Sequence, residues 1–528
     1  MVDSPKITQA ILSVSDKSGL AEFAAGLVAA GVELLSTGGT QDFLRQRGIA
    51  VRDVASYTGF PEMLDGRLKT LHPKIFGGIL GRPNREDDRQ SLRSAGIEWL
   101  PLVVVNLYPF EATVARNVSE PETIEQIDIG GPSLVRAAAK NHAFVTVATD
   151  ARQYGEILQQ IAASGCTTLE LRRRLAVEAF RLTARYDRAI TDYLARNADA
   201  ADGPDAADFP DTFNPQWRRQ CVLRYGENPH QRAALYVGNS PEGSSLVTAR
   251  QLHGKDLSYN NLLDLDAALG IVRDLPEPSM AVIKHHNPCG AGSAATLAAA
   301  TRKALGGDPL SAFGSVLGCN RPVEADAAEV LCAPDLFIEA VVAPSFSNEA
   351  LEILTSRPKW RANVRLMEVR DLRSGREPFD YRFVNGGCLV QDADNQPDPE
   401  SDWRVVTRCE PTQDQWDELR FAWALVRHVK SNAIVVTSDR TLCGAGAGQM
   451  SRVDAVEIAL RKAGDRAVGG VLASDAFFPF ADSIHLAGRA GIRAIIQPGG
   501  SRRDDETAAA CDELGLPMIF TGRRHFRH

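Results

Sequence analysis

The sequence predicts an α/β protein with at least two domains, and three observations support this prediction. Over roughly the first 200 residues, short apolar runs typical of buried strands alternate with amphipathic helical segments. A polar segment without periodicity, 198–216, follows, and the same alternation then resumes. The length of 528 residues is also more than one domain usually contains.

The first part of the chain is predicted to form a largely parallel sheet covered by helices. Leu20, Phe23, Ala24, Leu27 and Val28 recur at helical spacing after the first strand, and Gly31 ends that helix. A second helix is expected from the Gly38-Gly39 turn to Arg47, and a long one over 169–196. Buried strands are expected at 11–14, 32–35, 51–54, 102–107 and 144–148.

Residues 198–216 are rich in Ala, Asp and Pro and are predicted to be a linker between domains. Beyond them, a second polar stretch, 391–402, is expected to divide the remaining chain in two. No short-period repeat is visible, so a solenoid is not expected. Further strands are predicted at 281–283, 340–343, 433–436, 470–473 and 493–496.

The composition excludes several classes of protein. The 59 basic and 67 acidic residues give a net charge of −8, which argues against a nucleic-acid partner. The nine cysteines are isolated from one another and form no C-x-x-C pair, which argues against a disulfide framework and suits a reducing compartment. No apolar run is long enough for a membrane span, and the N-terminus lacks the pattern of a signal peptide. We therefore expect a cytoplasmic enzyme without membrane contact.

A first group of polar loops follows the predicted strands of the first domain. Residues 36–40, Ser-Thr-Gly-Gly-Thr, leave a strand and open a helix, an arrangement that binds phosphate. The alternative is an ordinary connection with Thr40 as helix N-cap. Since ligands bind where parallel strands end, these loops are predicted to converge on one phosphorylated ligand: 13–17, 36–40, 66–73, 106–110 and 126–131.

A second group lies beyond the linker. Lys284, His285 and His286 follow a hydrophobic strand, which suits either catalysis or a surface loop with satisfied histidines. A zinc deaminase site is excluded because His286 is followed by Asn-Pro and Cys289 has no second cysteine three residues on. Arg224 suits a phosphate. The aromatic segment 474–480 is expected either to bind a flat heteroaromatic ring or to form a cluster in the core. The basic C-terminus, 523–528, is expected to be either a frayed tail or a set of side chains that bind an anion.

Taken together, these segments resemble the bifunctional purine-biosynthesis family that formylates aminoimidazole carboxamide ribonucleotide and then closes the ring to inosine monophosphate. The resemblance runs from Ser13 to the C-terminus. It is carried by long motifs in the family's order: LLSTGGT, GFPEMLDGRLKTLHP, NLYPF, QIDIGGPSLVRAAAKNH, LRYGENPHQ, IKHHNPCG, SAFGS, VKSNAIV, GAGQMSR, SDAFFPF and IQPGGS.

The resemblance implies a methylglyoxal-synthase-like cyclohydrolase domain at 1–197, the linker at 198–216, and a formyltransferase portion at 217–528 built from two cytidine-deaminase-like α/β units. It also implies 10-formyltetrahydrofolate as co-substrate, no catalytic metal, and a homodimer with formyltransferase sites at its interface. It leaves open whether a structural monovalent cation is bound. The alternatives are a non-catalytic purine-nucleotide-binding regulatory protein and, by fold analogy alone, a zinc deaminase, although the missing zinc ligands count against the latter.

Residue roles in the cyclohydrolase follow from the matching motifs. Lys69 is expected to stabilise an oxyanion, while Tyr108, Asp128 and Lys140 move the protons that let water leave. Phe76 stands where the resemblance leads us to expect His. The positions implied to bind the nucleotide are Ser15, Lys17, Thr37, Gly38, Gly39, Thr40, Arg67, Thr70 and Asn106.

In the formyltransferase, the resemblance implies His285 as base, Lys284 as electrostatic stabiliser or acid, and Asn432 as donor to the formyl oxygen. His286 stands where a small residue is expected, so the choice between His285 and His286 as base is open. The implied nucleotide-binding residues are Arg224, Tyr225, Asn261, Gly314, Glu339 and Arg524. The implied folate-binding residues are Phe313, Arg452, Asp475, Phe477 and Phe478.

Overall fold

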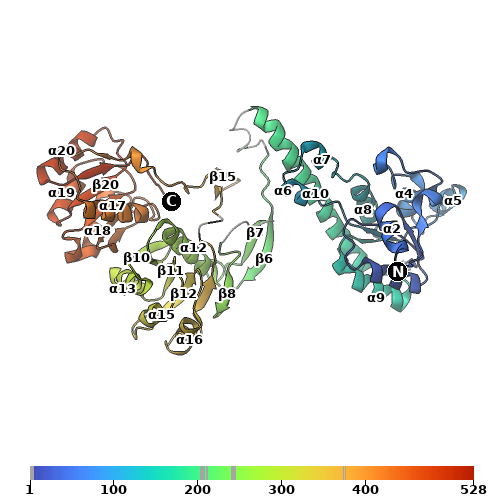
Figure 1. Cartoon of the computed structure of the whole chain (residues 1–528), viewed down its shortest axis with the longest axis horizontal. Helices are drawn as coiled ribbons and strands as arrows, with labels where there is room; N and C mark the ends of the chain where they lie inside the picture. The colour runs from blue at the N-terminus through green and yellow to red at the C-terminus, as the bar shows by residue number, and fades with distance from the viewer. Residues whose placement is uncertain (1–4, 203–208, 210–211, 239–244, 373, 375) are drawn as a thin grey trace. The chain divides into compact units, whose positions relative to one another are not determined.

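The computed structural model describes residues 5–202, 209, 212–238, 245–372, 374 and 376–528 (Figure 1). The chain divides into two compact units, Met1–Phe213 and Asn214–His528. The last helix of the first unit, α10, spans Leu169–Asp202 and so continues into the predicted linker. The alanine-rich sequence there favours a helix although it has no hydrophobic period. Most of the remaining predicted linker, 203–208 and 210–211, lies outside the described residues.

The first unit contains a five-stranded sheet in the order β3-β2-β1-β4-β5, and every neighbouring pair is parallel. This confirms the predicted parallel sheet. The strands are β1 (Gln9–Ser13), β2 (Glu33–Ser36), β3 (Arg52–Asp53), β4 (Leu102–Val105) and β5 (Thr146–Ala148). The helices before α10 are α1 (Leu20–Ala29), α2 (Gly38–Arg45), α3 (Val54–Thr58), α4 (Pro73–Leu80), α5 (Glu86–Ser94), α6 (Phe110–Ala115), α7 (Glu120–Ile124), α8 (Gly130–Lys140) and α9 (Tyr154–Ser164), with 3-10 turns η1 (Leu64–Gly66) and η2 (Ala151–Gln153).

The core of the first unit lies between the sheet and its helices. All four residues of β4 are buried, as expected for a central strand covered on both faces. On α1 the predicted apolar face is buried through Leu20, Phe23, Ala24 and Leu27, whereas Val28 is exposed. The polar loops that follow β1, β2 and β4 therefore all leave the carboxyl edge of one rigid sheet.

The second unit is built on a twelve-stranded sheet in the order β16-β21-β20-β19-β17-β18-β10-β9-β11-β12-β13-β8. Its strands are β8 (Arg250–His253), β9 (Ser279–Lys284), β10 (Asn287–Ser293), β11 (Ser315–Cys319), β12 (Ile338–Ala343), β13 (Arg365–Glu368), β16 (Arg404–Val405), β17 (Ile434–Ser438), β18 (Thr441–Gly446), β19 (Val471–Ser474), β20 (Ala494–Gln497) and β21 (Met518–Phe520). Two separate hairpins are β6 (Trp217–Leu223) with β7 (Ala233–Gly238), and β14 (Phe379–Val384) with β15 (Gly387–Asp392).

The helices of the second unit follow the same order in its two halves. The first half, which we define as residues 245–372, contains α12 (Tyr259–Asp274), α13 (Leu297–Gly307), α14 (Pro309–Ala312), α15 (Ala325–Leu331) and α16 (Asn348–Ser356). The second half, residues 400–528, contains η3 (Glu400–Asp402), α17 (Gln413–Val426), α18 (Arg452–Ala463), η4 (Gly464–Ala467), α19 (Asp482–Arg489) and α20 (Asp504–Leu514).

In each half a long helix precedes an antiparallel hairpin, another helix follows it, and four further strands extend the sheet outward from the hairpin. The β9–β10 hairpin of the first half and the β17–β18 hairpin of the second half are neighbours in the sheet, because β10 pairs with β18. The repetition agrees with two α/β units divided near the polar stretch 391–402. That these units are cytidine-deaminase-like stays a prediction.

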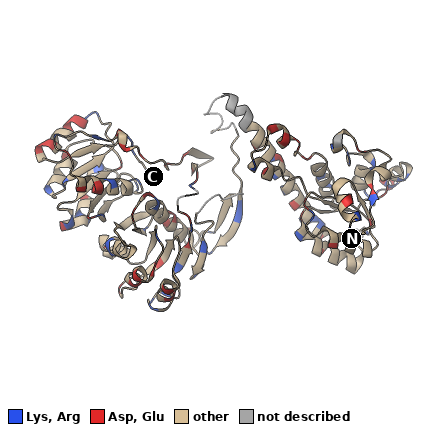
Figure 2. Cartoon of the chain, viewed as in Figure 1, with Lys and Arg blue, Asp and Glu red and all other residues tan. Residues whose placement is uncertain are grey.

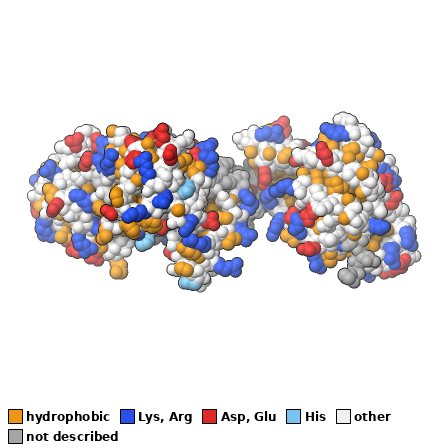
Figure 3. All heavy atoms as spheres, turned by 90° about the horizontal axis from the view of Figure 1, so that it is seen from below, with side chains coloured by type: hydrophobic (Ala, Val, Ile, Leu, Met, Phe, Trp, Pro, Cys, Tyr) orange, Lys and Arg blue, Asp and Glu red, His pale blue; other side chains and the backbone are white. Residues whose placement is uncertain are grey.

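Charged side chains of both signs are interspersed along the elements of each unit (Figure 2). The face drawn in Figure 3 likewise mixes basic, acidic and apolar side chains. None of the described helices combines the length and apolar character that crossing a membrane requires.

Candidate active sites

In the first unit, one cavity of about 620 Å³ lies at the carboxyl edge of the sheet. It collects the predicted loops because parallel strands end at the same edge. Every residue predicted for this site lines it except Lys140: Ser15, Lys17, Thr37, Gly38, Gly39, Thr40, Arg67, Lys69, Thr70, Asn106, Tyr108 and Asp128.

One end of this cavity suits an anion. Thr37 precedes α2 with extended backbone, and its side chain makes no capping hydrogen bond. The first N–H groups of α2 therefore remain for a ligand. Gly38 has φ 53°, and a Cβ there would lie 3.2 Å from Lys69 Nζ. Glycine thus lets a cation and a helix N-terminus approach the same point.

Two of the predicted nucleotide-binding residues hold the loops together. Thr40 is buried, and its hydroxyl accepts from Val14 N at 3.1 Å and donates to Val14 O at 3.0 Å. Asn106 Oδ1 accepts from Ser15 N at 2.6 Å and from Asp16 N at 3.0 Å. These side chains shape the cavity by joining the loop after β1 to its neighbours.

Two of the three cations that line the cavity, Arg67 and Lys69, are paired with carboxylates. Lys69 Nζ lies 3.0 Å from Glu62 Oε1, and Arg67 forms an ion pair with Glu125. Arg67 and both carboxylates are more than one-third exposed, so neither pair is strongly stabilising. An anionic ligand could therefore replace the carboxylates at low cost.

The carboxyl group of Asp128 is partly buried and surrounded by backbone N–H groups. Burial raises its pKa, although N–H groups of Gly131, Tyr108 and Gly130 oppose the shift. Its Oδ1 accepts from Gly131 N at 2.7 Å, and its own N–H donates to Tyr186 Oη at 2.8 Å. Tyr186, on α10, was missed by the sequence analysis because nothing in its local pattern distinguishes it from other helix residues.

Lys140 lies away from this cavity within the chain. It is the last residue of α8, while Gly130 and Gly131 at the start of that helix line the cavity. Eleven helical residues extend about 15 Å, which separates the two ends. Lys140 instead lines another cavity of about 560 Å³ together with Phe76. The expectation that Lys140 joins Lys69 is thus not met within one chain.

In the second unit, Lys284 and His285 lie at the tip of the β9–β10 hairpin. His285 and His286 form its two-residue turn, with φ of 55° and 65°. His286 N donates to Asp264 Oδ1 on α12 at 2.8 Å, which fixes the turn to the helix. His285 is exposed. Lys284 Nζ donates to Phe313 O at 2.6 Å and Gly314 O at 3.1 Å.

The sheet register explains why several predicted nucleotide-binding residues lie near Lys284. β11 pairs with both β9 and β12, which places Gly314 and Glu339 at the same edge of the sheet as Lys284. A Cβ on Gly314, whose φ is 71°, would lie 3.1 Å from Lys284 Nζ. Glu339 Oε2 accepts from Arg365 Nη1 at 2.8 Å.

Three other predicted nucleotide-binding residues, Asn261, Arg224 and Tyr225, belong to α12 or to a loop that is bonded to its start. Asn261 is buried and forms a capping box with Ser258. Asn260 Nδ2 donates to Glu227 O at 3.2 Å, which ties the loop carrying Arg224 and Tyr225 to the same helix. Arg224 lies over the ring of Tyr225, 4.9 Å from its centroid.

Asn432 is brought to the Lys284 hairpin by a residue that the sequence analysis did not select. Asn287 Oδ1 accepts from Lys430 N at 3.0 Å. Asn432 itself is firmly oriented, since its Oδ1 accepts from Arg452 Nη2 at 2.7 Å and its Nδ2 donates to Gln449 O at 2.8 Å. Asn287 belongs to the IKHHNPCG motif, so the motif itself held the missing signal.

Arg452 and Asp475, expected on the folate side, lie behind Asn432. They form a buried ion pair, and Asp475 also accepts from Ser431 Oγ and, at 3.1 Å, from Ala433 N. Asp475 has no exposed surface. In this arrangement both residues orient the segment that carries Asn432.

The aromatic residues expected to contact folate divide into two groups. Phe313 and Phe477 are 58% and 36% exposed, so their rings are available to a ligand. Phe478 is 1% exposed and belongs to the hydrophobic core of the second half. The expectation that Phe478 contacts a ligand is therefore wrong for this conformation, because its ring packs inward.

The basic C-terminus is not frayed. Ser431 N donates to Arg527 O at 2.9 Å, and Lys430 Nζ donates to His528 O at 2.5 Å. Phe526 and His528 line a cavity of about 290 Å³ with Asn432. Arg524 lies over the Phe526 ring, 4.6 Å from its centroid.

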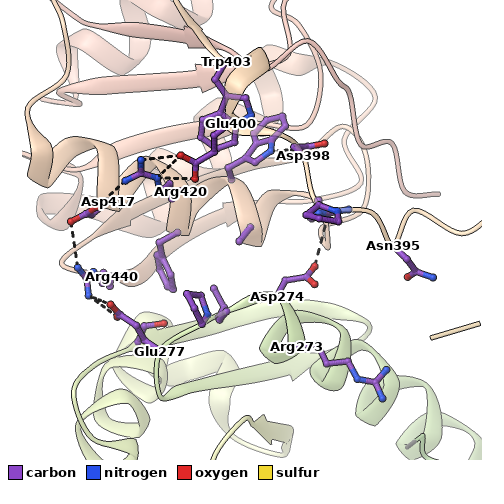
Figure 4. Close-up of a pocket in the computed structure, with 18 of the residues that line it drawn as sticks. Arg273, Asp274, Glu277, Asn395, Asp398, Glu400, Trp403, Asp417, Arg420 and Arg440 are labelled. Carbon is purple, nitrogen blue, oxygen red and sulfur yellow. Dashed lines mark hydrogen bonds and ion pairs between the residues drawn. The ribbon is translucent and has the colours of Figure 1, made fainter. Parts of the chain in front are cut away.

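A larger cavity of about 610 Å³ lies between the two halves (Figure 4). Its acids and arginines point at one another: Arg420 pairs with Glu400 and Asp417, and Arg440 pairs with Glu277. Over the described part of the chain, no group of three or more His, Cys, Asp or Glu side chains is placed to hold a metal ion.

Comparison with known protein families identifies two types of region in the chain. An MGS-like domain model matches residues 19–133, and the AICARFT/IMPCHase bienzyme model matches residues 138–462. The match confirms the type of fold predicted for the first domain.

Full-length relatives carry the name bifunctional purine biosynthesis protein PurH. The protein from Rhodopirellula baltica is 58% identical over 529 residues, with 100% of both chains covered. That from Desulfitobacterium hafniense is 49% identical over 523 residues, covering 98% of this chain and 99% of its own. Among solved structures, ForH aligns with 35% of this chain and 95% of its own at 33% identity and a TM-score of 0.32. From its full-length similarity to these relatives, the chain belongs to the AICARFT/IMPCHase bienzyme family.

Proposed function

We propose that this chain transfers a formyl group from 10-formyltetrahydrofolate to 5-aminoimidazole-4-carboxamide ribonucleotide and then closes the product to inosine monophosphate with loss of water. The observation that carries the proposal is the hydrogen bond from Lys430 N to Asn287 Oδ1, because it joins the Lys284 hairpin to the Asn432 segment. We assign ring closure to residues 1–197 and formyl transfer to residues 217–528, joined by the linker 198–216.

In formyl transfer, the substrate amine attacks the formyl carbon and loses a proton. His285 is exposed at the turn and serves as the base. Lys284 uses two of its three hydrogens on the carbonyls of Phe313 and Gly314. The third remains for the substrate or the departing folate nitrogen. Because these two hydrogen bonds already orient Lys284, its ammonium group need not reorganise during the reaction.

Asn432 supplies the donor to the tetrahedral oxyanion. One Nδ2 hydrogen is used on Gln449 O, and the second is left for the formyl oxygen. Arg452 donates to Asn432 Oδ1, which fixes the amide with its nitrogen as the donor. Exposed rings of Phe313 and Phe477 offer flat surfaces for the folate co-substrate.

In ring closure, the formyl group and the carboxamide nitrogen belong to one molecule, so positioning supplies much of the acceleration. The N–H groups at the start of α2, with Lys17 and Arg67, hold the phosphate. Lys69 stabilises the developing oxyanion. Asp128, whose pKa burial raises, and Tyr108 move the protons that release water. Lys140 contributes to this site only if another copy of the chain or a change of conformation brings it there.

We further propose that the protein acts in the cytoplasm as a homodimer with its formyltransferase sites at the interface. Support comes from the β14–β15 hairpin, where Phe383, Val384 and Leu389 are all about half exposed or more. Apolar groups exposed together are typical of an interface. A non-catalytic nucleotide-binding role has no observation in its favour.

The test is a coupled assay with both substrates that follows tetrahydrofolate and inosine monophosphate separately. We expect wild type to form both products. Lys69→Ala should still form tetrahydrofolate while inosine monophosphate formation falls by roughly 10²-fold or more, because an oxyanion donor is lost. Nucleotide binding without either product would instead establish a binding protein, and equal loss of both products in Lys69→Ala would contradict two separate sites.

A further inference from the structure

His525 is the most enclosed titratable group of the C-terminal segment, and no step above uses it. It is 4% exposed. Its Nδ1 lies 2.5 Å from Asp394 Oδ2, and its Nε2 lies 2.7 Å from Asp398 Oδ2. Ionised carboxylates only accept hydrogen bonds, so both ring nitrogens must carry hydrogen to satisfy both contacts. With both carboxylates ionised, the geometry therefore requires an imidazolium.

The surroundings of His525 balance its charge. Trp423 donates to Asp398 Oδ2 at 2.7 Å and packs edge-on against the imidazole. Arg427 Nη2 lies 3.2 Å from Asp394 Oδ1. Two cations thus face two carboxylates, and the side chain of Asp398 is only 3% exposed. The side chain of Asp394 is 57% exposed, so the buried part of the cluster is the His525–Asp398 pair, which is stable only while each charge keeps its partner.

The pKa values follow the same contacts. Burial lowers the pKa of His525, but its bonds to Asp394 and Asp398 raise it by more, so the net shift is upward from 6.5. The bonds to His525 likewise hold the pKa of both aspartates below the usual value, against the effect of burial. The imidazolium is the dominant form below the raised pKa and is lost as the pH rises through it.

His525 also stands at the centre of the segment that walls the Asn432 cavity. Its N–H donates to Asp475 O at 3.0 Å. Arg524 precedes it, and Phe526 and His528, which line the cavity, follow it. Anchoring this one side chain therefore restrains the backbone on both sides.

We propose that His525, as an imidazolium between Asp394 and Asp398, is a positioning residue for formyl transfer. It holds the C-terminal segment so that Arg524 meets the nucleotide and Phe526 and His528 complete the wall beside Asn432. This inference rests on the proposed function. It predicts that affinity for the nucleotide is high below the pKa of His525 and declines above it, at a pH higher than 6.5.

The first experiment measures kcat and KM for the aminoimidazole nucleotide between pH 6 and 9 in wild type, His525→Gln and His485→Gln. His485 lies on α19 and serves as the matched control. In His525→Gln we expect KM to rise roughly tenfold near pH 6.5, as when hydrogen bonds to charged groups are lost, with a smaller change in kcat. The wild-type KM should approach that of the variant at high pH, and His485→Gln should follow wild type throughout.

Asp394→Asn is the second variant and remains informative if His525→Gln does not fold, which heat unfolding would reveal. Loss of one carboxylate lowers the pKa of His525, so the alkaline rise in KM should move to lower pH. A purely structural role would leave that rise in place. Identical KM and pH profiles in wild type and His525→Gln, or an unmoved rise in Asp394→Asn, would overturn the positioning role. Absence of formyl transfer in wild type at every pH would contradict the proposed function instead.

Discussion

The two halves of the second unit share one backbone plan and differ in the chemistry of a single turn. The β9–β10 turn, His285-His286, and the β17–β18 turn, Asp439-Arg440, both have left-handed φ, at 55° and 65° against 50° and 49°. Such backbone is uncommon outside glycine and often accompanies function. Since both turns have left-handed φ angles, this backbone conformation is a property of the two-residue turns and does not by itself mark the active site.

Each turn is also fixed in the same way. The second turn residue donates its N–H to an acid on the preceding helix: His286 to Asp264 on α12 at 2.8 Å, and Arg440 to Glu418 on α17 at 2.7 Å. Both acids are the sixth residue of their helix. The half that carries Lys284 therefore differs from its counterpart in side chains rather than in frame.

The side chains decide what each turn does. Asp439 pairs with Lys303, and Arg440 pairs with Glu277 of the first half (Figure 4). Lys284, by contrast, contacts carbonyl oxygens, and His285 is exposed. The Asp439-Arg440 turn therefore joins the halves through ion pairs, whereas Lys284, just before the other turn, contacts backbone carbonyls.

The largest expected difference between the halves concerns Lys284 and its counterpart Ser438, each the residue before its turn. Lys284→Ala should reduce the rate of formyl transfer by roughly 10²–10⁴-fold, because charge at the reacting group is lost. Ser438→Ala should stay within about twofold of wild type. The assay follows tetrahydrofolate, with ring closure of separately supplied formylated nucleotide as the internal control. Full activity in Lys284→Ala would show that the two turns do not differ in function.

A second prediction tests whether the two hairpins pack equally closely against the helix that follows each of them. A Cβ on Gly290 would lie 2.0 Å from Ala304 O, and one on Gly444 would lie 2.1 Å from Ala459 O. Gly290→Ala and Gly444→Ala should each lower the free energy of unfolding by about 1–3 kcal/mol, since the helix must move off the hairpin.

Urea unfolding followed by circular dichroism measures both variants, and Gly306→Ala, where no neighbouring atom lies within 4 Å, is the matched control. Destabilisation in one half alone would mean that the two hairpins are not equivalent in packing.

The smallest expected effect concerns stability, and it compares Glu418 with Asp264, the two acids that accept hydrogen bonds from the turns. Burial raises the pKa of Glu418, so its ionised form disfavours the fold, and stability should fall as the pH rises from 4.5 through that pKa. Glu418→Gln keeps the acceptor for Arg440 N and removes the penalty. We expect a gain in stability at pH 7 of about 1 kcal/mol or less and unchanged formyl transfer.

Heat unfolding at pH 5 and pH 7 checks the Glu418 prediction, and Asp264→Asn is the matched variant in the other half. A loss of stability at pH 7 in Glu418→Gln would show that the ionised carboxylate is needed. A fall in formyl transfer in Asp264→Asn alone would sharpen the contrast between the two turns.

The parallel sheet and first cavity could be predicted because strand ends in such a sheet must meet at one edge. Lys140 could not be placed, since neighbours in a motif separate along the length of α8. The repeated hairpin has a sequence signal that was not recognised, because it is only four residues long. The tetrapeptide Cys-Gly-Ala-Gly at 289–292 recurs at 443–446. Asp394 and Asp398 lie in the stretch 391–402, whose polarity predicted only a boundary between two parts of the chain.

By itself, the sequence determined the α/β class, the loops that line the first cavity, the family motifs and the Lys284-His285 pair, because each depends on local spacing or on strand order. Only the tertiary structure decided that Arg452 and Asp475 stand behind Asn432, that Phe478 faces the core, and that His525 lies between two carboxylates. Those outcomes depend on which distant segments pack together, and burial and charge pairing between them have no signature in local sequence.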